Sequence, residues 1–252
     1  MSKEKIKFAV VGCGHIGKRH ATMISNNSES ELVALCDVLP RNKLNLGDLG
    51  SVDLFSSLED LLSSNLDFDV VNICTPNGLH SEQAILALDK NKHIVVEKPI
   101  GLSKAKCEQV IYKALRNHKQ VFAVMQNRYS PPSVWLKKIV EEKIIGDVFI
   151  VQVNCYWNRD ARYYKSGGWK GTSDLDGGTL FTQFSHFIDI MYWLCGDINN
   201  IQGKFNDFTH KDSTAFEDSG LVTFDFVDGG MGCLNYSTAI WDKNLESSIT
   251  II

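Results

Sequence analysis

The sequence lacks several features that would assign the protein to a class directly. No apolar run approaches the roughly 20 residues that a membrane-spanning helix needs, and no signal-type apolar stretch follows the first lysines. The net charge of -4 excludes the broad cationic field that non-specific nucleic-acid binding requires. Internal repeats and low-complexity segments are also absent. We therefore expect a cytoplasmic protein whose partners are neither nucleic acids nor membranes.

Cysteine pairing is a further absence. The chain has 7 cysteines, but none forms a Cys-x-x-Cys pair or a Cys/His cluster with zinc spacing. Because their number is odd and they lie far apart, we expect reduced, mostly buried thiols and no metal site. A single reactive cysteine is the alternative, although Cys36 and Cys74 lie in apolar runs where packing is the simpler role.

The first half of the chain alternates short apolar runs with helical stretches. With 44% hydrophobic residues, the 252-residue chain can form one large core or two modest ones, and two domains are expected. Continuous apolar runs are typical of parallel strands that are covered on both faces. We predict such strands at residues 7–11, 32–36, 70–74, 93–96 and 121–125. Helices between them, one at 103–117 with Ser103 as its N-cap, predict a doubly wound α/β sheet of the Rossmann type.

The pattern changes near Pro131-Pro132, which begins a predicted helix to about residue 143. Longer β-type runs follow at 147–156, 198–206, 220–227 and 231–240. A long apolar helix is predicted at 178–194. The expected architecture is a Rossmann domain at 1–127 and an α+β domain with a mostly antiparallel open sheet at 128–252. Because the chain stops inside a strand-like segment, we expect that a C-terminal piece is missing.

A glycine motif follows the first predicted strand. In this Gly-x-Gly-x-x-Gly motif, Gly12 permits a tight turn, Gly14 lets the backbone approach a pyrophosphate, and Gly17 allows close helix packing. The helix that begins at His15 and Ile16 directs its amino terminus at the phosphates. The strand-turn-helix context therefore predicts a dinucleotide site, and a tight turn without a nucleotide is the alternative.

Asp37 completes this pattern at the end of the second strand, twenty residues after Gly17. A carboxylate there can accept hydrogen bonds from the ribose hydroxyls of the adenosine. It would also repel a 2′-phosphate, so NAD is favoured over NADP. Arg41 is the one residue nearby that could bind such a phosphate, and a solvated position at a helix start is the simpler interpretation.

Polar motifs follow two later strands, at the edge where open α/β sheets bind ligands. They are Thr75-Pro-Asn77 with His80, and Glu97-Lys-Pro99 about twenty residues later. Together with the glycine motif, Asp37, and Gly177-Gly178 before His186 and Asp189, they resemble the Gfo/Idh/MocA family of sugar and cyclitol dehydrogenases over nearly the whole chain. The resemblance implies a cofactor site that includes Thr75, Pro76, Asn77, His80, Glu97 and Lys98.

The resemblance also implies the catalytic groups. In that family the lysine of Glu-Lys-Pro and the histidine of the long helix flank the reacting carbinol, which carries over to Lys98 and His186. Removal of a hydride requires that the hydroxyl proton leave as well, and a positioned base contributes about 10²- to 10⁴-fold. We assign His186 as the base and Lys98 as the orienting donor, and the exchanged roles are the alternative. Many relatives have an aspartate where this chain has Thr182, so Asp189 is a candidate to orient His186, with a capping or interdomain contact as the other interpretation.

A cationic loop precedes that helix. Residues 156–172 carry four cations against one acid, interleaved with aromatic rings. Such a loop suits an anionic ligand that offers rings for stacking, such as a nucleotide sugar. An exposed loop or a subunit contact is the alternative.

The same loop resembles one branch of the family, which oxidises UDP-N-acetylglucosaminuronate at C3 for lipopolysaccharide O-antigen synthesis. That resemblance implies substrate contacts from Arg159, Tyr163, Tyr164, Trp169, Thr182, Gln183 and Asp189. Thr182 departs from the asparagine that is usual in the branch. Some members keep NAD bound and regenerate it with 2-oxoglutarate, and the family forms homodimers or homotetramers through the open sheet. The alternatives are another sugar or cyclitol dehydrogenase and a non-catalytic NAD-binding sensor.

Overall fold

The computed structural model describes residues 4–252. The chain divides into two compact units, unit 1 up to Val124 and unit 2 from Met125 to Ile252. The boundary expected from sequence, after residue 127, lies three residues farther along the chain. Within residues 4–252, no helix combines the length and the apolar character that crossing a membrane would need.

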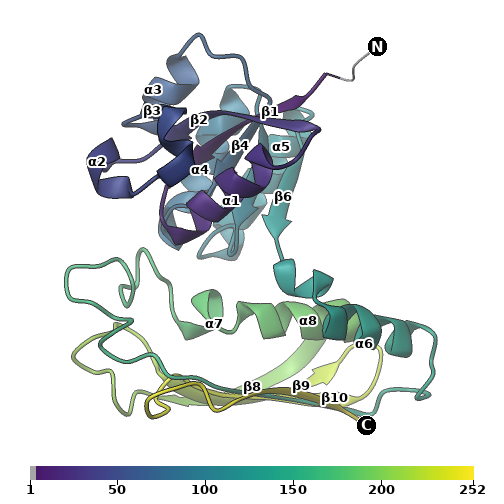
Figure 1. Ribbon diagram of the computed structural model, residues 1–252. Helices are drawn as coiled ribbons and strands as arrows, with labels where there is room; N and C mark the ends of the chain where they lie inside the picture. The colour runs from purple at the N-terminus through teal and green to yellow at the C-terminus, as the bar shows by residue number, and fades with distance from the viewer. Residues whose placement is uncertain (1–3) are drawn as a thin grey trace. The chain divides into compact units, whose positions relative to one another are not determined.

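Unit 1 is built on a six-stranded sheet with the strand order β3-β2-β1-β4-β5-β6 (Figure 1). Every pairing in it is parallel. The strands are β1 (Ile6–Val11), β2 (Ser30–Cys36), β3 (Asp53–Phe55), β4 (Val70–Ile73), β5 (His93–Glu97) and β6 (Val121–Val124). This order confirms the doubly wound Rossmann sheet, in which strands are added on one side of β1 as far as β3 and on its other side from β4 onward. Strand β3 was not predicted from the sequence, because three residues are too few to show a pattern.

Helices connect the strands of unit 1. They are α1 (His15–Ser25), α2 (Arg41–Leu44), α3 (Leu58–Ser63), α4 (His80–Asp89) and α5 (Lys104–Arg116), with the short 3-10 helices η1 (Gly47–Ser51) and η2 (Asn77–Leu79). The expected N-cap of α5 is confirmed, because the Ser103 side chain accepts a hydrogen bond from the Lys106 N–H. Central strand residues such as Val71 and Ile94 are fully buried. Each such side chain stabilises the fold by about 1.5–3 kcal/mol, which makes the sheet a rigid support for the loops at its edge.

Unit 2 contains a five-stranded sheet with the order β11-β7-β10-β9-β8. Its elements are η3 (Gln126–Tyr129), α6 (Pro131–Glu141), β7 (Ile150–Tyr156), α7 (Thr179–Thr182), α8 (Ser185–Cys195), β8 (Ile198–Asn206), β9 (Ser219–Phe226), β10 (Met231–Ser237) and β11 (Glu246–Ile251). Only β7 and β10 pair in parallel, which confirms the mostly antiparallel sheet. Figure 1 shows α6 and α8 along one face of this sheet. Strand β9 alternates buried and exposed residues, as a sheet covered on one face requires.

The long helix expected at 178–194 is interrupted. Helix α7 ends at Thr182, and α8 begins at Ser185. The carbonyl of Thr179 accepts hydrogen bonds from the N–H groups of both Gln183 and Phe184, at 2.9 Å each. A bond that spans five residues widens the helical turn, and such turns are frequent at functional sites. The single-helix prediction was therefore wrong at Gln183 and Phe184.

Candidate functional site

The glycine turn after β1 is shaped by close backbone contacts. Gly12 has a φ of +87°, and a Cβ placed on it would lie 2.7 Å from the carbonyl oxygen of Cys74. A Cβ on Gly17 would lie 1.7 Å from the carbonyl oxygen of Gly12, so helix α1 approaches the turn too closely for any side chain. At Gly14 a Cβ would meet nothing within 4 Å. The turn therefore fits a dinucleotide, because open space at Gly14 lets a pyrophosphate approach the backbone near the start of α1.

The carboxylate of Asp37 lies beside this turn. One of its oxygens accepts a hydrogen bond from the Cys13 N–H at 2.6 Å, and the other accepts one from the Leu39 N–H at 2.9 Å. The adjacent Arg41 guanidinium donates to the carbonyl oxygens of Gly50 and Val52. The Arg41 guanidinium is thus held by two backbone carbonyl oxygens of the protein itself. This agrees with the simpler interpretation of Arg41, as a residue at a helix start and not a ligand of a phosphate.

All seven cysteines are free thiols in the described chain. Burial, with a smaller contribution from Asp37, raises the pKa of Cys13 to about 11. Burial likewise raises the pKa of Cys36 and of Cys155 to about 12. Because the thiolate is the reactive form, these three residues are packing cysteines rather than nucleophiles.

His80 joins the two motif loops at the carboxyl ends of β4 and β5. Its ring is 1% exposed, with Nε2 at 2.8 Å from the Thr75 carbonyl oxygen and Nδ1 at 2.7 Å from the Pro99 carbonyl oxygen. Burial lowers the pKa of His80, and the two carbonyl contacts oppose this shift. The imidazole therefore connects the Thr75-Pro-Asn77 loop to the Glu97-Lys-Pro99 loop. Its expected role in cofactor binding would then be indirect, because His80 holds the two loops in place.

A partly buried contact also fixes Glu97, the residue before Lys98. The Glu97 carboxylate lies 3.0 Å from Nε2 of His20, and Nδ1 of His20 lies 3.1 Å from the Asn72 amide nitrogen. His20 belongs to α1, so these contacts connect the helix of the glycine motif to the end of β5 and of β4. His20 was not among the residues predicted from sequence, although its position one turn after Gly17 on the same helix is a usable signal.

A cavity of about 760 Å³ in unit 1 lies at the other end of the sheet. Its lining includes Lys7 of β1, Asp69 before β4, His93 of β5 and Gln120 before β6. These residues mark the amino ends of the parallel strands, whereas the motifs follow the carboxyl ends. None of the predicted site residues lines this cavity, so it is separate from the dinucleotide site.

Cations and aromatic rings pack together in the loop after β7. The Arg159 guanidinium carbon lies 4.7 Å from the ring centroid of Trp157 and 5.1 Å from that of Tyr163. The Lys170 ammonium lies 3.8 Å from the centroid of the same Tyr163 ring. Burial lowers the pKa of Lys170, and the carboxylate of Asp176 opposes this shift. We call Trp157, Arg159, Tyr163 and Lys170 the cation-aromatic cluster; its Trp157 and Lys170 were not among the predicted site residues, although the interleaving of cations and rings contained them.

Gln183 lies next to this cluster, at the interruption between α7 and α8. The residue is 3% exposed, and neither its amide oxygen nor its amide nitrogen has a hydrogen-bond partner. The Tyr163 hydroxyl interacts with this amide without completing a bond of normal geometry. The buried Nε of Arg159 also has no partner. An unsatisfied buried polar group costs about 1–3 kcal/mol, so a cluster of them indicates a place where a polar ligand binds.

Thr182 is connected to the loop by Asp176. Its hydroxyl donates to the Asp176 carboxylate and lies 3.1 Å from the Asp176 carbonyl oxygen. The same carboxylate, which is fully buried, accepts a hydrogen bond from the Gly171 N–H at 2.8 Å. Asp176 thus joins α7 to the loop, and Thr182 has a structural partner in addition to its expected substrate contact. Nearby, Tyr164 is 5% exposed and packs edge-on against Tyr163, while the Trp169 carbonyl accepts from the Thr172 hydroxyl.

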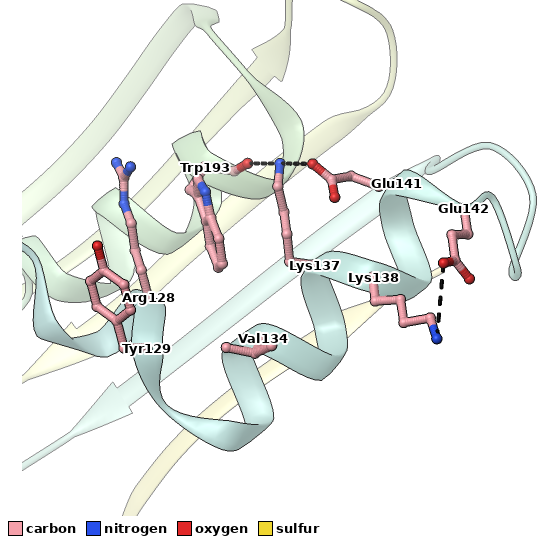
Figure 2. Close-up of a pocket in the computed structure, with 8 residues that line it drawn as sticks. All are labelled: Arg128, Tyr129, Val134, Lys137, Lys138, Glu141, Glu142 and Trp193. Carbon is pink, nitrogen blue, oxygen red and sulfur yellow. Dashed lines mark hydrogen bonds and ion pairs between the residues drawn. The ribbon is translucent and has the colours of Figure 1, made fainter.

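Asp189, on α8 with His186, forms an ion pair within unit 2. Its two carboxylate oxygens accept hydrogen bonds from Nε of Arg128 at 2.8 Å and from Nη2 at 2.5 Å. The Arg128 guanidinium and the Lys137 ammonium lie 5.7 and 5.3 Å from the Trp193 ring. Figure 2 shows Arg128, Lys137 and Trp193 among the residues that line a neighbouring cavity. Its volume is about 460 Å³, and none of the predicted site residues lines it. The ion pair gives Asp189 a role in joining η3 to α8.

Comparison with known proteins extends these observations. Residues 6–125 match the profile described as "Oxidoreductase family, NAD-binding Rossmann fold", and residues 134–252 match that of the "GFO/IDH/MocA C-terminal domain". The WlbA dehydrogenase of Chromobacterium violaceum, solved with NADH and UDP-GlcNAcA, is 32% identical with a TM-score of 0.92, over 100% of this chain and 72% of that one. The Bordetella pertussis WlbA dehydrogenase, solved with the same two ligands, is 31% identical with a TM-score of 0.93, over 100% and 75%.

A curated relative gives a different activity. The inositol 2-dehydrogenase of Salmonella typhimurium is 28% identical over 196 residues, which are 76% of this chain and 55% of that protein. The chain therefore spans about half the length of this curated relative. The WlbA dehydrogenases were solved with a nucleotide sugar bound, whereas the curated relative is named for a cyclitol.

Proposed function

The chain belongs to the Gfo/Idh/MocA family of oxidoreductases, and we propose that it acts as an NAD-dependent dehydrogenase on UDP-N-acetylglucosaminuronate. The reaction would convert the C3 hydroxyl of the sugar to a ketone. The observation that carries this proposal is the cation-aromatic cluster beside the unpartnered, buried amide of Gln183.

The chemistry of the cluster favours an anionic nucleotide sugar over a cyclitol. Arg159 and Lys170 supply two cations, and Tyr163 and Trp157 supply ring faces. A diphosphate or a uronate carboxylate is the natural partner of an arginine, and a uracil ring can stack on an aromatic side chain. The Gln183 amide offers an NH₂ group that donates and a carbonyl oxygen that accepts, which suits the hydroxyl or N-acetyl groups of a sugar. A neutral cyclitol would add no counter-charge for these two cations beyond the Asp176 carboxylate, which already acts on Lys170.

The residues of unit 1 fit the cofactor. NAD supplies the hydride acceptor when it is bound. Gly12, Gly14 and the amino terminus of α1 would hold the pyrophosphate, and Asp37 would bind the ribose hydroxyls. The Asp37 carboxylate accounts for a preference for NAD over NADP.

Two side chains carry the proton chemistry in this proposal. His186 accepts the proton of the C3 hydroxyl, while the hydride leaves the same carbon. Lys98 donates a hydrogen bond to the developing alkoxide and stabilises its negative charge. The braces on the motif loops, His80 and the pair of His20 with Glu97, would limit the movement of the residues around Lys98.

The proposal is tested by NADH formation with a panel of four candidate substrates. UDP-N-acetylglucosaminuronate should be oxidised; UDP-N-acetylglucosamine lacks the carboxylate, free N-acetylglucosaminuronate lacks the nucleotide, and myo-inositol lacks both. If NAD copurifies with the protein, 2-oxoglutarate is added as the acceptor and 2-hydroxyglutarate is measured. Oxidation of myo-inositol without oxidation of any UDP-sugar would overturn the proposed substrate. The assignment as an NAD-dependent dehydrogenase would still stand.

A variant at Lys98 tests the enzymatic role separately. Lys98→Met should lower kcat by about 10²- to 10⁴-fold, while NAD binding, followed by fluorescence titration, stays within about 3-fold of the wild type. The matched control is Lys106→Met, on the exposed face of α5, which should alter neither quantity. Turnover that survives in Lys98→Met would overturn the catalytic assignment.

A further inference from the structure

The loop between β8 and β9 contains a buried histidine and aspartate pair. His210 is 6% exposed, Asp218 is 1% exposed, and Nδ1 of His210 lies 3.0 Å from Oδ2 of Asp218. The same carboxylate oxygen accepts hydrogen bonds from the N–H groups of Phe208 at 3.1 Å and Thr209 at 2.8 Å, and from the Thr209 hydroxyl. The imidazole is therefore held on one side by a carboxylate that is itself fixed by backbone donors.

The other ring nitrogen of His210 reaches the cation-aromatic cluster. Nε2 lies 2.5 Å from the carbonyl oxygen of Arg159, which is 51 residues earlier in the sequence. A carbonyl oxygen only accepts hydrogen bonds, so Nε2 is the donor in this contact. The ring also packs edge-on against Tyr164, with centroids 5.4 Å apart. The backbone N–H of Arg159 donates to the Thr238 carbonyl oxygen at 2.9 Å. Both backbone polar groups of Arg159, its N–H and its carbonyl oxygen, are therefore hydrogen-bonded.

Asp207, His210 and Asp218 also have the side chains of a metal site, with ligand atoms within 4.8 Å of one another. Their hydrogen bonds argue against that use. Oδ2 of Asp218 already accepts four hydrogen bonds, both ring nitrogens of His210 are engaged, and the Asp207 carboxylate accepts the His210 N–H. A metal ion would have to displace several of these contacts.

We infer that His210 is a positioning residue for substrate binding: Asp218 orients its ring, and its Nε2–H fixes the backbone of Arg159. Fixing this backbone restricts the guanidinium to its place between the Trp157 and Tyr163 rings. The inference deepens the proposed function and rests on it for the identity of the ligand, but the contact between His210 and Arg159 can be tested without any ligand.

Three substitutions separate the two ring nitrogens. His210→Gln places an amide donor near the position of Nε2, His210→Asn places one near Nδ1, and His210→Phe keeps only the ring. We expect KM for the UDP-uronate to rise about 10-fold in the Asn and Phe variants with kcat within about 3-fold, and to stay within about 3-fold in the Gln variant. KM for NAD should be unchanged in all three. Equal KM values for the Asn and Gln variants, or a larger rise in the Gln variant, would overturn the inference.

Limited proteolysis gives a readout that does not depend on the substrate. Trypsin cleaves after arginine, so release of the Arg159 carbonyl should speed cleavage at the Arg159-Asp160 bond in the Asn and Phe variants about 10-fold, at a temperature where thermal unfolding shows each variant folded. The Gln variant should match the wild type. Equal cleavage in all four proteins would overturn the inference, as would loss of activity on treatment with a chelator and its recovery with zinc. If the wild type binds no UDP-sugar but the cleavage order holds, the proposed function fails and the positioning role stands.

Discussion

The two units prepare their sites in different ways. In unit 1 most of the motif contacts involve the backbone: the Gly12 N–H donates to the Cys36 carbonyl oxygen, Asp37 accepts from the Cys13 N–H, and His80 contacts two carbonyl oxygens. The contact of His20 with Glu97 is the exception described above, because it joins two side chains. In unit 2 the candidate site is made of side chains that contact one another, and polar atoms of Arg159 and Gln183 are buried without partners.

This difference separates a general function from a specific one. A backbone turn recognises a pyrophosphate through geometry that glycine and close packing enforce, so the same turn serves any protein that binds a dinucleotide. A side-chain cluster with unmet hydrogen-bonding capacity suits one class of ligand. Unit 1 therefore indicates the cofactor, and in the proposed function unit 2 selects the substrate.

The largest effect that the comparison predicts is at Gly17. Gly17→Ala places a Cβ 1.7 Å from the Gly12 carbonyl oxygen, which is backbone and cannot move aside. We expect a loss of about 3 kcal/mol or more in the free energy of unfolding, and a loss of NAD binding. Urea denaturation and NAD titration measure the two quantities.

Gly14→Ala is the matched control for this prediction. Its Cβ would meet nothing within 4 Å, so the fold should keep its stability within about 0.5 kcal/mol. NAD binding should still weaken, because the added methyl group occupies the space through which the pyrophosphate approaches. Equal destabilisation by the two substitutions would show that the turn is not set by backbone packing.

Acid stability gives the second test, since each unit buries a group that acid protonates. Burial would raise the pKa of Asp218, but hydrogen bonds from Thr209 and His210 outweigh it and hold the pKa at about 2, below the ordinary 3.8. Its contribution, about 1–2 kcal/mol, is present above pH 3.8 and is lost as the pH falls towards 2. The difference in unfolding free energy between wild type and Asp218→Asn should shrink over this interval, and a constant difference would contradict the assignment.

His80 in unit 1 should respond at a higher pH. Burial lowers its pKa below the ordinary 6.5 and outweighs the two carbonyl contacts, so the fold favours the neutral ring, in which one of the two ring nitrogens donates. The stability that this provides is present above pH 6.5 and is lost as the pH falls through the lowered pKa. Hydrogen exchange of peptides from each unit should therefore show unit 1 loosening first on acidification, and His80→Gln should remove that early step.

The fold was largely predictable from sequence because its signals are local. Parallel buried strands appear as continuous apolar runs, the glycine turn lies within six residues, and Ser103 caps a helix three residues from its donor. The short strand β3 and the interruption at Gln183 escaped prediction. The first has too few residues for a pattern, and the second depends on the backbone hydrogen bonds of Thr179, which no side-chain pattern records.

The candidate site was less predictable because its contacts are distant in sequence. Asp189 pairs with Arg128, 61 residues away, and His210 reaches Arg159 across 51 residues. The sequence spacing placed Asp189 on the same helix as His186. It could not show whether Asp189 orients His186 or makes a structural contact elsewhere. His210 lies in a loop without periodicity, so nothing in its neighbourhood indicates its partner.

The smallest predicted effect concerns Gln183 and has the opposite sign. A methionine has nearly the same length and no group that requires a hydrogen bond, so Gln183→Met removes two unsatisfied polar atoms from a buried position. We expect the free energy of unfolding to rise by about 1 kcal/mol, and the affinity for the UDP-uronate, measured by calorimetry, to fall about 10-fold.

The exposed Gln152 on β7 provides the control, since Gln152→Met should change neither quantity by more than about 0.5 kcal/mol. A loss of stability in Gln183→Met would mean that the amide is satisfied in the folded protein, and the contrast between the units would then disappear. A gain in stability without a loss of affinity would leave the unpartnered amide with no ligand to explain it. Only a Gln183→Met variant that is both more stable and weaker in binding supports the proposal for unit 2. In that case the Gln183 amide lowers the stability of the fold and is kept because it binds the substrate.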